Sequence, residues 1–149
     1  MTARTRSGAS CPRLAIASRT TSISPWVVTP EALAPFRIAQ PARPEGDPAP
    51  LPYLADPLDQ ARGAFDLEIE VLLHTPCLKA KHLPPHRLSI GSTKHLYWTV
   101  AQLVTHHASN GCNLRPGDLL GSGTVSGETK DSRGCLLELT MRGRDRIQL

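Results

Sequence analysis

The chain has 149 residues, the length of one domain or a piece of one, and 14 prolines, 11 glycines and 4% aromatic residues leave it poor in core material. The net charge of +4 comes from four arginines that precede the first acidic residue, Glu31, so it does not indicate a nucleic-acid-binding protein. No run approaches the ~18 consecutive apolar residues of a membrane span, which excludes a membrane-spanning protein.

Residues 1–20, MTARTRSGASCPRLAIASRT, are rich in Arg, Ser, Thr and Ala and contain no acidic residue. This composition is typical of an organelle transit peptide, and equally of a disordered or non-native lead-in. Further on, Thr29 and Pro30 predict the start of a short helix, with Thr29 as its cap, that ends at Pro35. Six prolines from Pro41 to Pro57 then predict an extended crossing.

Residues 65–72, FDLEIEVL, alternate as a strand, with Phe65, Leu67, Ile69 and Val71 expected to face inward. On the other face, Asp66, Glu68 and Glu70 form an acidic stripe. Such a stripe can bind a divalent cation, but it is more often the solvated face of an edge strand, which we favour here.

The four cysteines are too widely spaced for a C-x-x-C site, and without a secretion signal they are expected to be reduced thiols in a cytoplasmic protein. Cys77, His82 and His86 have spacing close to a zinc half-site. Because Pro84 and Pro85 prevent the helix that normally presents two histidines, we favour an ordinary loop there.

Residues 93–109 place Leu96, Val100, Leu103 and Val104 at the three-and-four spacing of a helix that buries one face. Ser92 can cap its start and Asn110-Gly111 can end it, which puts His106 and His107 in its last turn.

Residues 121–127, GSGTVSG, form a glycine-rich loop that is either an anion cradle, to which Thr124 would add a hydroxyl, or the corner of a hairpin. Residues 135–141 alternate as a strand with Glu138 in the middle. Glu138 therefore lies either on a solvated sheet face or in a site where its charge has a partner.

Three blocks carry a family resemblance: HLYWTVAQLVTHHASNGCNLRPGDLLGSGTVSG followed by LLEL, SISPWVVTPEALAPFR, and PLPYL. In the order in which they occur along the chain, they resemble the C-terminal catalytic domain of the fumarylacetoacetate hydrolase family, over residues 21–149. The resemblance implies an α+β, β-rich fold, a partial mixed β-roll with one main helix. Because it begins abruptly at Thr21, we expect residues 1–20 to be unmatched and disordered.

The family resemblance also implies the chemistry. Its members hydrolyse a carbon-carbon bond in a β-diketone, converting fumarylacetoacetate to fumarate and acetoacetate in tyrosine and phenylalanine catabolism, as homodimers that use Mg²⁺ or Ca²⁺. Position by position, Glu138 matches the glutamate that orients a water-activating histidine, Thr124 the threonine that grips the substrate carboxylate, and Thr21 a threonine beside the metal.

The family's base histidine, metal carboxylates and substrate-binding tyrosines and arginines precede the matched region. Its lysine is absent near Ile16 or Ala17, and His106 and His107 correspond to helix residues outside the reaction centre. We therefore expect the chain to be a truncated hydrolase that is inactive alone. The alternative is a non-catalytic remnant or interaction module that docks on a full-length homologue.

Overall fold

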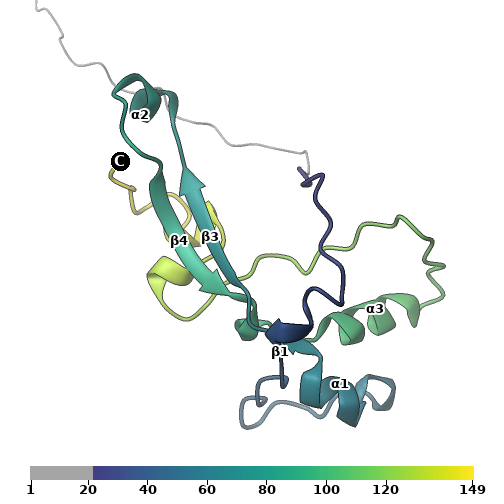
Figure 1. Ribbon diagram of the computed structural model, residues 1–149. Coiled ribbons are helices and arrows are strands. Elements are labelled where there is room, and N and C mark those ends of the chain that lie inside the picture. The colour runs from purple at the N-terminus through teal and green to yellow at the C-terminus, as the bar shows by residue number, and fades with distance from the viewer. Residues whose placement is uncertain (1–21) are drawn as a thin grey trace, which may run out of the picture.

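The computed structural model describes residues 22–149, in which short helices and two small antiparallel sheets alternate along the chain (Figure 1). The α-helices are α1 (Pro57–Arg62), α2 (Pro76–Ala80), α3 (Val100–Ala108) and α4 (Leu136–Leu139). The strands are β1 (Arg37–Ile38), β2 (Ala64–Phe65), β3 (Glu68–Leu73) and β4 (His86–Ser92). Single 3-10 turns occur at Ala34–Phe36, Pro52–Leu54, Thr93–His95 and Lys130–Ser132.

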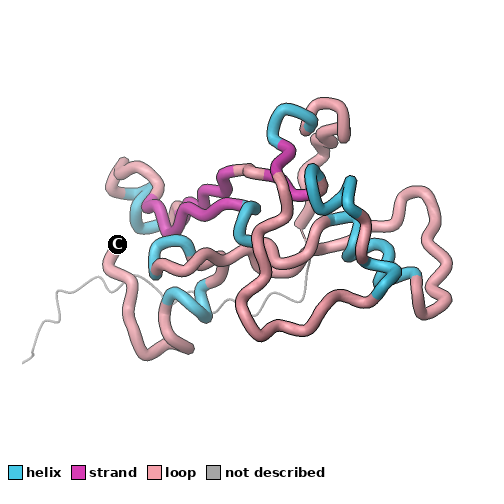
Figure 2. Tube along the Cα trace, turned by 90° about the horizontal axis from the view of Figure 1, so that it is seen from below, coloured by secondary structure: helices cyan, strands magenta, loops and turns pink. Residues whose placement is uncertain are grey.

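The two sheets are each a single antiparallel pair. β1 pairs with β2, and β3 pairs with β4 with a register shift between Val71 and Leu72. α2 lies at the tip of the β3–β4 hairpin, whereas α1 and α3 lie at the opposite end of the molecule (Figures 1 and 2). This mixture of helices and small antiparallel sheets agrees with the expected α+β class.

The strand expected over residues 65–72 is interrupted. Thr93 Oγ1 donates to the carbonyl of Phe65 over 2.7 Å and accepts from the amide of Leu67 over 2.9 Å. These two bonds satisfy the backbone where the chain passes from β2 to β3. Phe65, Leu67 and Val71 are half-buried, but Ile69 is 38% exposed, so the expected inward face is wrong at that position.

The expected helix over residues 93–109 begins later than its apolar spacing suggested. Ser92 caps only the 3-10 turn, while α3 starts after Thr99, whose side chain accepts from the amide of Gln102 over 3.1 Å in a capping box. Residues 96–99 separate the two elements. The end is as expected, because α3 stops at Ala108 and Gly111 adopts φ +87°, with His106 and His107 in the last turn.

The strand expected over residues 135–141 is wrong, since this segment contains the one-turn helix α4. The amide of Leu139 donates to the carbonyl of Cys135 over 3.1 Å, and that of Thr140 to the carbonyl of Leu136 over 2.9 Å. The backbone groups that a strand would offer to a neighbour are thus satisfied locally, and Leu139 is buried. The hairpin that this strand would have formed with the glycine-rich loop is consequently absent from the described residues.

Polar residues contribute as much as apolar ones to the most buried positions. Gln102 is 3% exposed; its Nε2 donates to the carbonyl of Leu54 over 2.9 Å, and its Oε1 accepts from the Thr99 amide and from Gln40 Nε2. Thr99 Oγ1 in turn donates to Asp59 Oδ2 over 2.5 Å. This network ties the proline-rich crossing and α1 to the start of α3.

The cysteines differ from one another. Cys77 is disulfide-bonded, so the expectation of reduced thiols is wrong for this residue, whereas Cys112 and Cys135 are free.

Within residues 22–149 no helix is long and apolar enough to cross a membrane.

Candidate functional site

The candidate site is built where the glycine-rich loop of residues 121–127 meets the segment that leads into α4. Gly123 has φ +79°, a conformation that glycine adopts without a Cβ clash. A Cβ on Gly134 would collide with the carbonyl oxygen of Val125 and crowd the methyl group of Thr124. Glycine at position 134 therefore allows the loop to pack closely against the start of α4.

Glu138 projects from α4 toward this loop. Its Oε2 accepts a hydrogen bond from Ser126 Oγ over 2.7 Å and a longer one from Cys135 Sγ over 3.3 Å. Ser126 Oγ itself accepts from the amide of Gly134 over 3.0 Å. Loop and helix are thus joined through one carboxylate oxygen.

The pKa of Glu138 is held below the ordinary carboxyl value of 4.5, chiefly because the Ser126 hydroxyl donates to the ionised form. The Cys135 thiol and the positive charge of Arg133 act in the same direction, and partial burial opposes them. Glu138 is therefore an anion at neutral pH, as a residue that orients a histidine base has to be.

Thr124 lines a cavity of about 220 Å³ together with Gly134, and its methyl group lies close to that glycine. The cavity is bounded by the loop and by the β3–β4 hairpin, including Ile69, Val71 and Ser89. Glu138 does not line it. The structure thus brings Thr124 and Glu138 to the same loop junction, through Gly134 and Ser126, without direct contact between them.

Two members of the acidic stripe are engaged in other contacts. Asp66 Oδ1 accepts from Ser92 Oγ over 2.6 Å, and Glu70 pairs with Arg87 at 3.8 Å. Among residues 22–149 no group of three or more His, Cys, Asp or Glu side chains could hold a metal ion. Thr21 lies just outside the described residues, so its expected place beside the metal stays a prediction.

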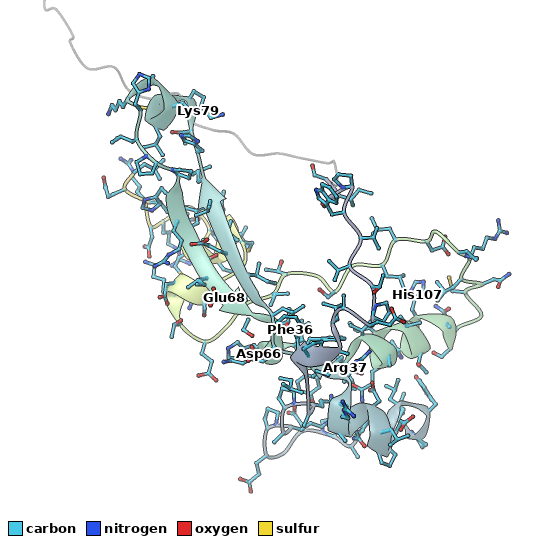
Figure 3. All side chains as sticks on the ribbon, in the orientation of Figure 1. Phe36, Arg37, Asp66, Glu68, Lys79 and His107 are labelled. Carbon is cyan, nitrogen blue, oxygen red and sulfur yellow. The ribbon has the colours of Figure 1, made fainter. Side chains whose placement is uncertain are left out.

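The paired histidines lie on α3. In Figure 3 the labelled His107 and Glu68 lie on opposite sides of β1, with Glu68 at the lower end of the β3–β4 hairpin. His106 Nδ1 is hydrogen-bonded to the hydroxyl of Tyr53 over 3.0 Å, and the two rings stack. Neither histidine is among the hydrogen-bond partners found for Glu138 in the described part of the chain.

The sequence analysis missed a second polar and aromatic cluster. The guanidinium of Arg43 lies over the rings of Tyr97 and Trp98, and Tyr97 donates from its hydroxyl to Asp47 over 2.6 Å. This hydrogen bond raises the pKa of Tyr97. The cluster borders a cavity of about 290 Å³ that Arg43 helps to line. Arg43 Nη1 donates to the Tyr97 hydroxyl over 2.8 Å, and Nη2 is buried without a hydrogen-bond partner among the described residues.

The sequence analysis also missed Ser126, Cys135 and Gly134 at the Glu138 site. The serine belongs to the same glycine-rich loop as Thr124, and that position was the available signal. The role of Ser126 depends on the fold of residues 135–139. A strand there would point the Glu138 side chain away from those of residues 137 and 139, whereas a helical turn brings its carboxylate back over Cys135.

Comparison with known proteins identifies the family. Residues 1–147 match the model described as "Fumarylacetoacetate (FAA) hydrolase C-terminal". The chain is 44% identical over 128 residues to a fumarylacetoacetase of Dictyostelium discoideum, which covers 86% of this chain. It is 45% identical over 134 residues to the fumarylacetoacetase of Arabidopsis thaliana and 42% identical over 129 residues to that of Homo sapiens, each covering 87% of this chain.

In each of these alignments the matched part is 28% of the relative's own length, so the chain spans little more than a quarter of the curated relatives that it matches. Identity above 40% over most of this chain, together with the model match, leaves no doubt about descent. The chain belongs to the fumarylacetoacetate hydrolase family.

Proposed function

We propose that the chain contributes part of the active site of a hydrolase that cleaves a carbon-carbon bond in a β-diketone, converting fumarylacetoacetate to fumarate and acetoacetate. The observation that carries this proposal is the ionised, hydrogen-bonded carboxylate of Glu138 beside the Thr124 loop, in a chain whose relatives are fumarylacetoacetases. In the complete enzyme its strands would belong to the mixed β-roll that the family resemblance implies.

In this reaction water adds to a carbonyl carbon, the bond to the neighbouring carbon breaks, and the bonding pair leaves on that carbon as an enolate that takes up a proton. Thr124 would hold a substrate carboxylate through its hydroxyl, helped by amides of the glycine-rich loop. Glu138 would orient a histidine and stabilise the imidazolium that forms when this base takes a proton from water. By the resemblance, that histidine precedes the matched motifs.

The metal and the oligomer belong to the same proposal. The described residues do not fit a divalent cation, because the only acidic stripe is engaged with Ser92 and Arg87. Mg²⁺ or Ca²⁺ would therefore be held by other residues, with Thr21 beside it, and no step is assigned to it here. The functional unit would be a homodimer acting on a small-molecule substrate.

A chimera tests the proposal. Residues 21–149 replace the matched segment of the Dictyostelium discoideum relative, and hydrolysis of fumarylacetoacetate is followed in the presence of Mg²⁺ or Ca²⁺. We expect an active chimera in which Glu138→Gln lowers kcat about 100-fold or more, since general base catalysis contributes typically that much. Glu128→Gln, which alters an exposed carboxylate in the same region, should leave the rate unchanged.

The 149-residue chain assayed alone is the second arm, and we expect no turnover, because both the base and the metal carboxylates are supplied by other positions. A folded but inactive chimera would contradict the proposal. Turnover by the chain alone that is lost in Glu138→Ala would show that a residue within it supplies the base.

The alternative is an interaction module that docks on a full-length homologue. Its support is the apolar run near residue 26, where Trp26 is 84% and Val27 87% exposed. Co-purification with the relative is the measurement. Docking without any activity in the chimera would favour this alternative.

A further inference from the structure

We propose that Ser126 is a positioning residue for Glu138: its hydroxyl, which accepts from the Gly134 amide, donates its single proton to Oε2 and so leaves Oε1 to face the catalytic base. This inference rests on the proposed function, because it concerns what Glu138 presents to that base. Ser126 joins the loop that carries Thr124 to the helix that carries Glu138.

The direction of the Ser126 proton follows from the hydrogen bonds. A serine hydroxyl has one proton and can accept through its lone pairs. The amide of Gly134 donates to Ser126 Oγ over 3.0 Å, and Glu138 Oε2 lies 2.7 Å from the same oxygen. An ionised carboxylate can only accept, so the Ser126 proton points to Oε2.

The second donor to the carboxylate, the Cys135 thiol, contacts the same oxygen, Oε2. Cys135 Sγ lies 3.3 Å from Oε2, and the backbone amide of Cys135 also lowers the pKa of Glu138. Among residues 22–149 the hydrogen bonds found for a named oxygen of this carboxylate are both made to Oε2. The terminal torsion of a glutamate is intrinsically broad, so these contacts select one orientation of the carboxylate. Orientation matters because a small misplacement of a catalytic group can lower a rate substantially.

The loop geometry depends on Gly134. A Cβ at this position would collide with the Val125 carbonyl, so only glycine brings its amide within reach of Ser126 in this conformation. Ser126 therefore links the loop that carries Thr124 to the carboxylate of Glu138.

Titration of the carboxyl carbon of Glu138 by NMR in the full 149-residue chain tests the hydrogen bond directly. We expect Ser126→Ala to move the Glu138 midpoint upward and Ser126→Thr, which keeps the hydroxyl, to restore it. Ser122→Ala changes a serine of the same loop whose hydroxyl, within residues 22–149, donates to the Gly123 carbonyl, and it should leave the midpoint unchanged. An unshifted midpoint in Ser126→Ala, with the amide spectrum otherwise preserved, would overturn the proposal.

The chimera tests the consequence for the reaction. Ser126→Ala should lower kcat by about tenfold with little change in KM and move the acid limb of the pH profile upward, and Ser126→Thr should recover both. An Ala variant with the parent's kcat and pH profile would refute the positioning role. If the parent chimera is itself inactive, the proposed function fails, while the NMR titration still decides whether Ser126 holds Glu138.

Discussion

Glu138 is stabilised as an anion chiefly by neutral donors, the Ser126 hydroxyl, the Cys135 thiol and the Cys135 amide, and not by a contacting ion pair. Cys135 is three residues from Glu138 and Ser126 is twelve residues away, in the glycine-rich loop. Arg133 contributes charge without bonding to the carboxylate, since its Nη1 donates to the Glu138 carbonyl over 3.3 Å. Such a carboxylate keeps its charge while its second oxygen stays available to a partner. This combination suits a group that orients a base.

The pH dependence of this site follows from the lowered pKa of Glu138. A carboxyl group with a folded pKa below its unfolded value stabilises the folded loop above the unfolded pKa, and this stabilisation is lost as the pH falls through the folded pKa. We expect the amide signals of Ser126 and Gly134 to shift on acidification below about pH 4.5 and Glu138→Gln to abolish that shift. Because Glu31 and Asp131 also have lowered pKa values, a local signal is needed. Identical acid titrations of both amides in parent and variant would contradict the expectation.

At the scale of elements, the termini of short helices decide where functional residues stand. α3 begins at a capping box that also contacts Asp59 of α1, and α4 begins at Cys135 beside the glycine-rich loop. The start of α3 is fixed by a contact with Asp59, which is distant in sequence. The start of α4 is fixed by the close approach of the glycine-rich loop at Gly134. One cap substitution and one glycine substitution, each with a matched control, test this.

Thr99→Ala removes the cap of α3 and its bond to Asp59. We expect a loss of about 1–2 kcal/mol in the free energy of unfolding and faster amide exchange over residues 100–108. Ser92→Ala, which removes only the cap of the preceding 3-10 turn and a surface bond to Asp66, should change stability by less than about 0.5 kcal/mol. Equal effects of the two substitutions would instead indicate that the helix starts at residue 93.

Gly134→Ala should displace the glycine-rich loop from α4. The added Cβ would meet the Val125 carbonyl, so we expect a cost of about 1–3 kcal/mol and loss of the Ser126–Glu138 bond. Gly121→Ala is the matched control, because nothing lies within 4 Å of its Cβ position. Chemical denaturation and the Glu138 titration report the two consequences, and a Gly134→Ala protein as stable as the control would show that the loop packs differently.

At the scale of the whole molecule, large apolar side chains remain exposed on several elements. They include Trp26 and Val27 before the 3-10 turn at Ala34–Phe36, Leu72 on β3, Val100 on α3 and Leu137 on α4. The buried apolar residues of the described part of the chain are few by comparison: Leu54, Ala64, Leu78 and Leu139. Such exposed faces are typical of surfaces that another part of a protein covers.

The isolated 149-residue chain should therefore melt over a broad temperature range and tend to aggregate, because limited burial at ~25 cal/mol per Å² scarcely offsets roughly 1–2 kcal/mol of backbone entropy per residue. The β3–β4 hairpin should be the least protected against exchange on its outer edge, since within the described residues β3 pairs only with β4. Scanning calorimetry with light scattering is the measurement. A sharp transition of a soluble monomer would show that these residues close their own core.

The sequence alone determined the family and the features that depend on neighbouring residues. The motifs around SPWVV and NGCNLRPGDLL identified the family, which the comparisons confirm, and the glycine at position 111 with the histidine pair located the end of α3. These features persist in any fold of the segment, because motif identity and local turn chemistry do not require distant contacts.

The tertiary structure decided the rest. Alternation over residues 135–141 is compatible with a strand only if a neighbour accepts its hydrogen bonds, and here the bonds close within one helical turn. The start of α3 shifted to Thr99 because Asp59 and the buried Gln102 hold that residue. The tertiary structure also decided the partners of Glu138. Ser126 reaches the Glu138 carboxylate only because Gly134 lets the loop approach α4, and spacing along the chain does not reveal this contact.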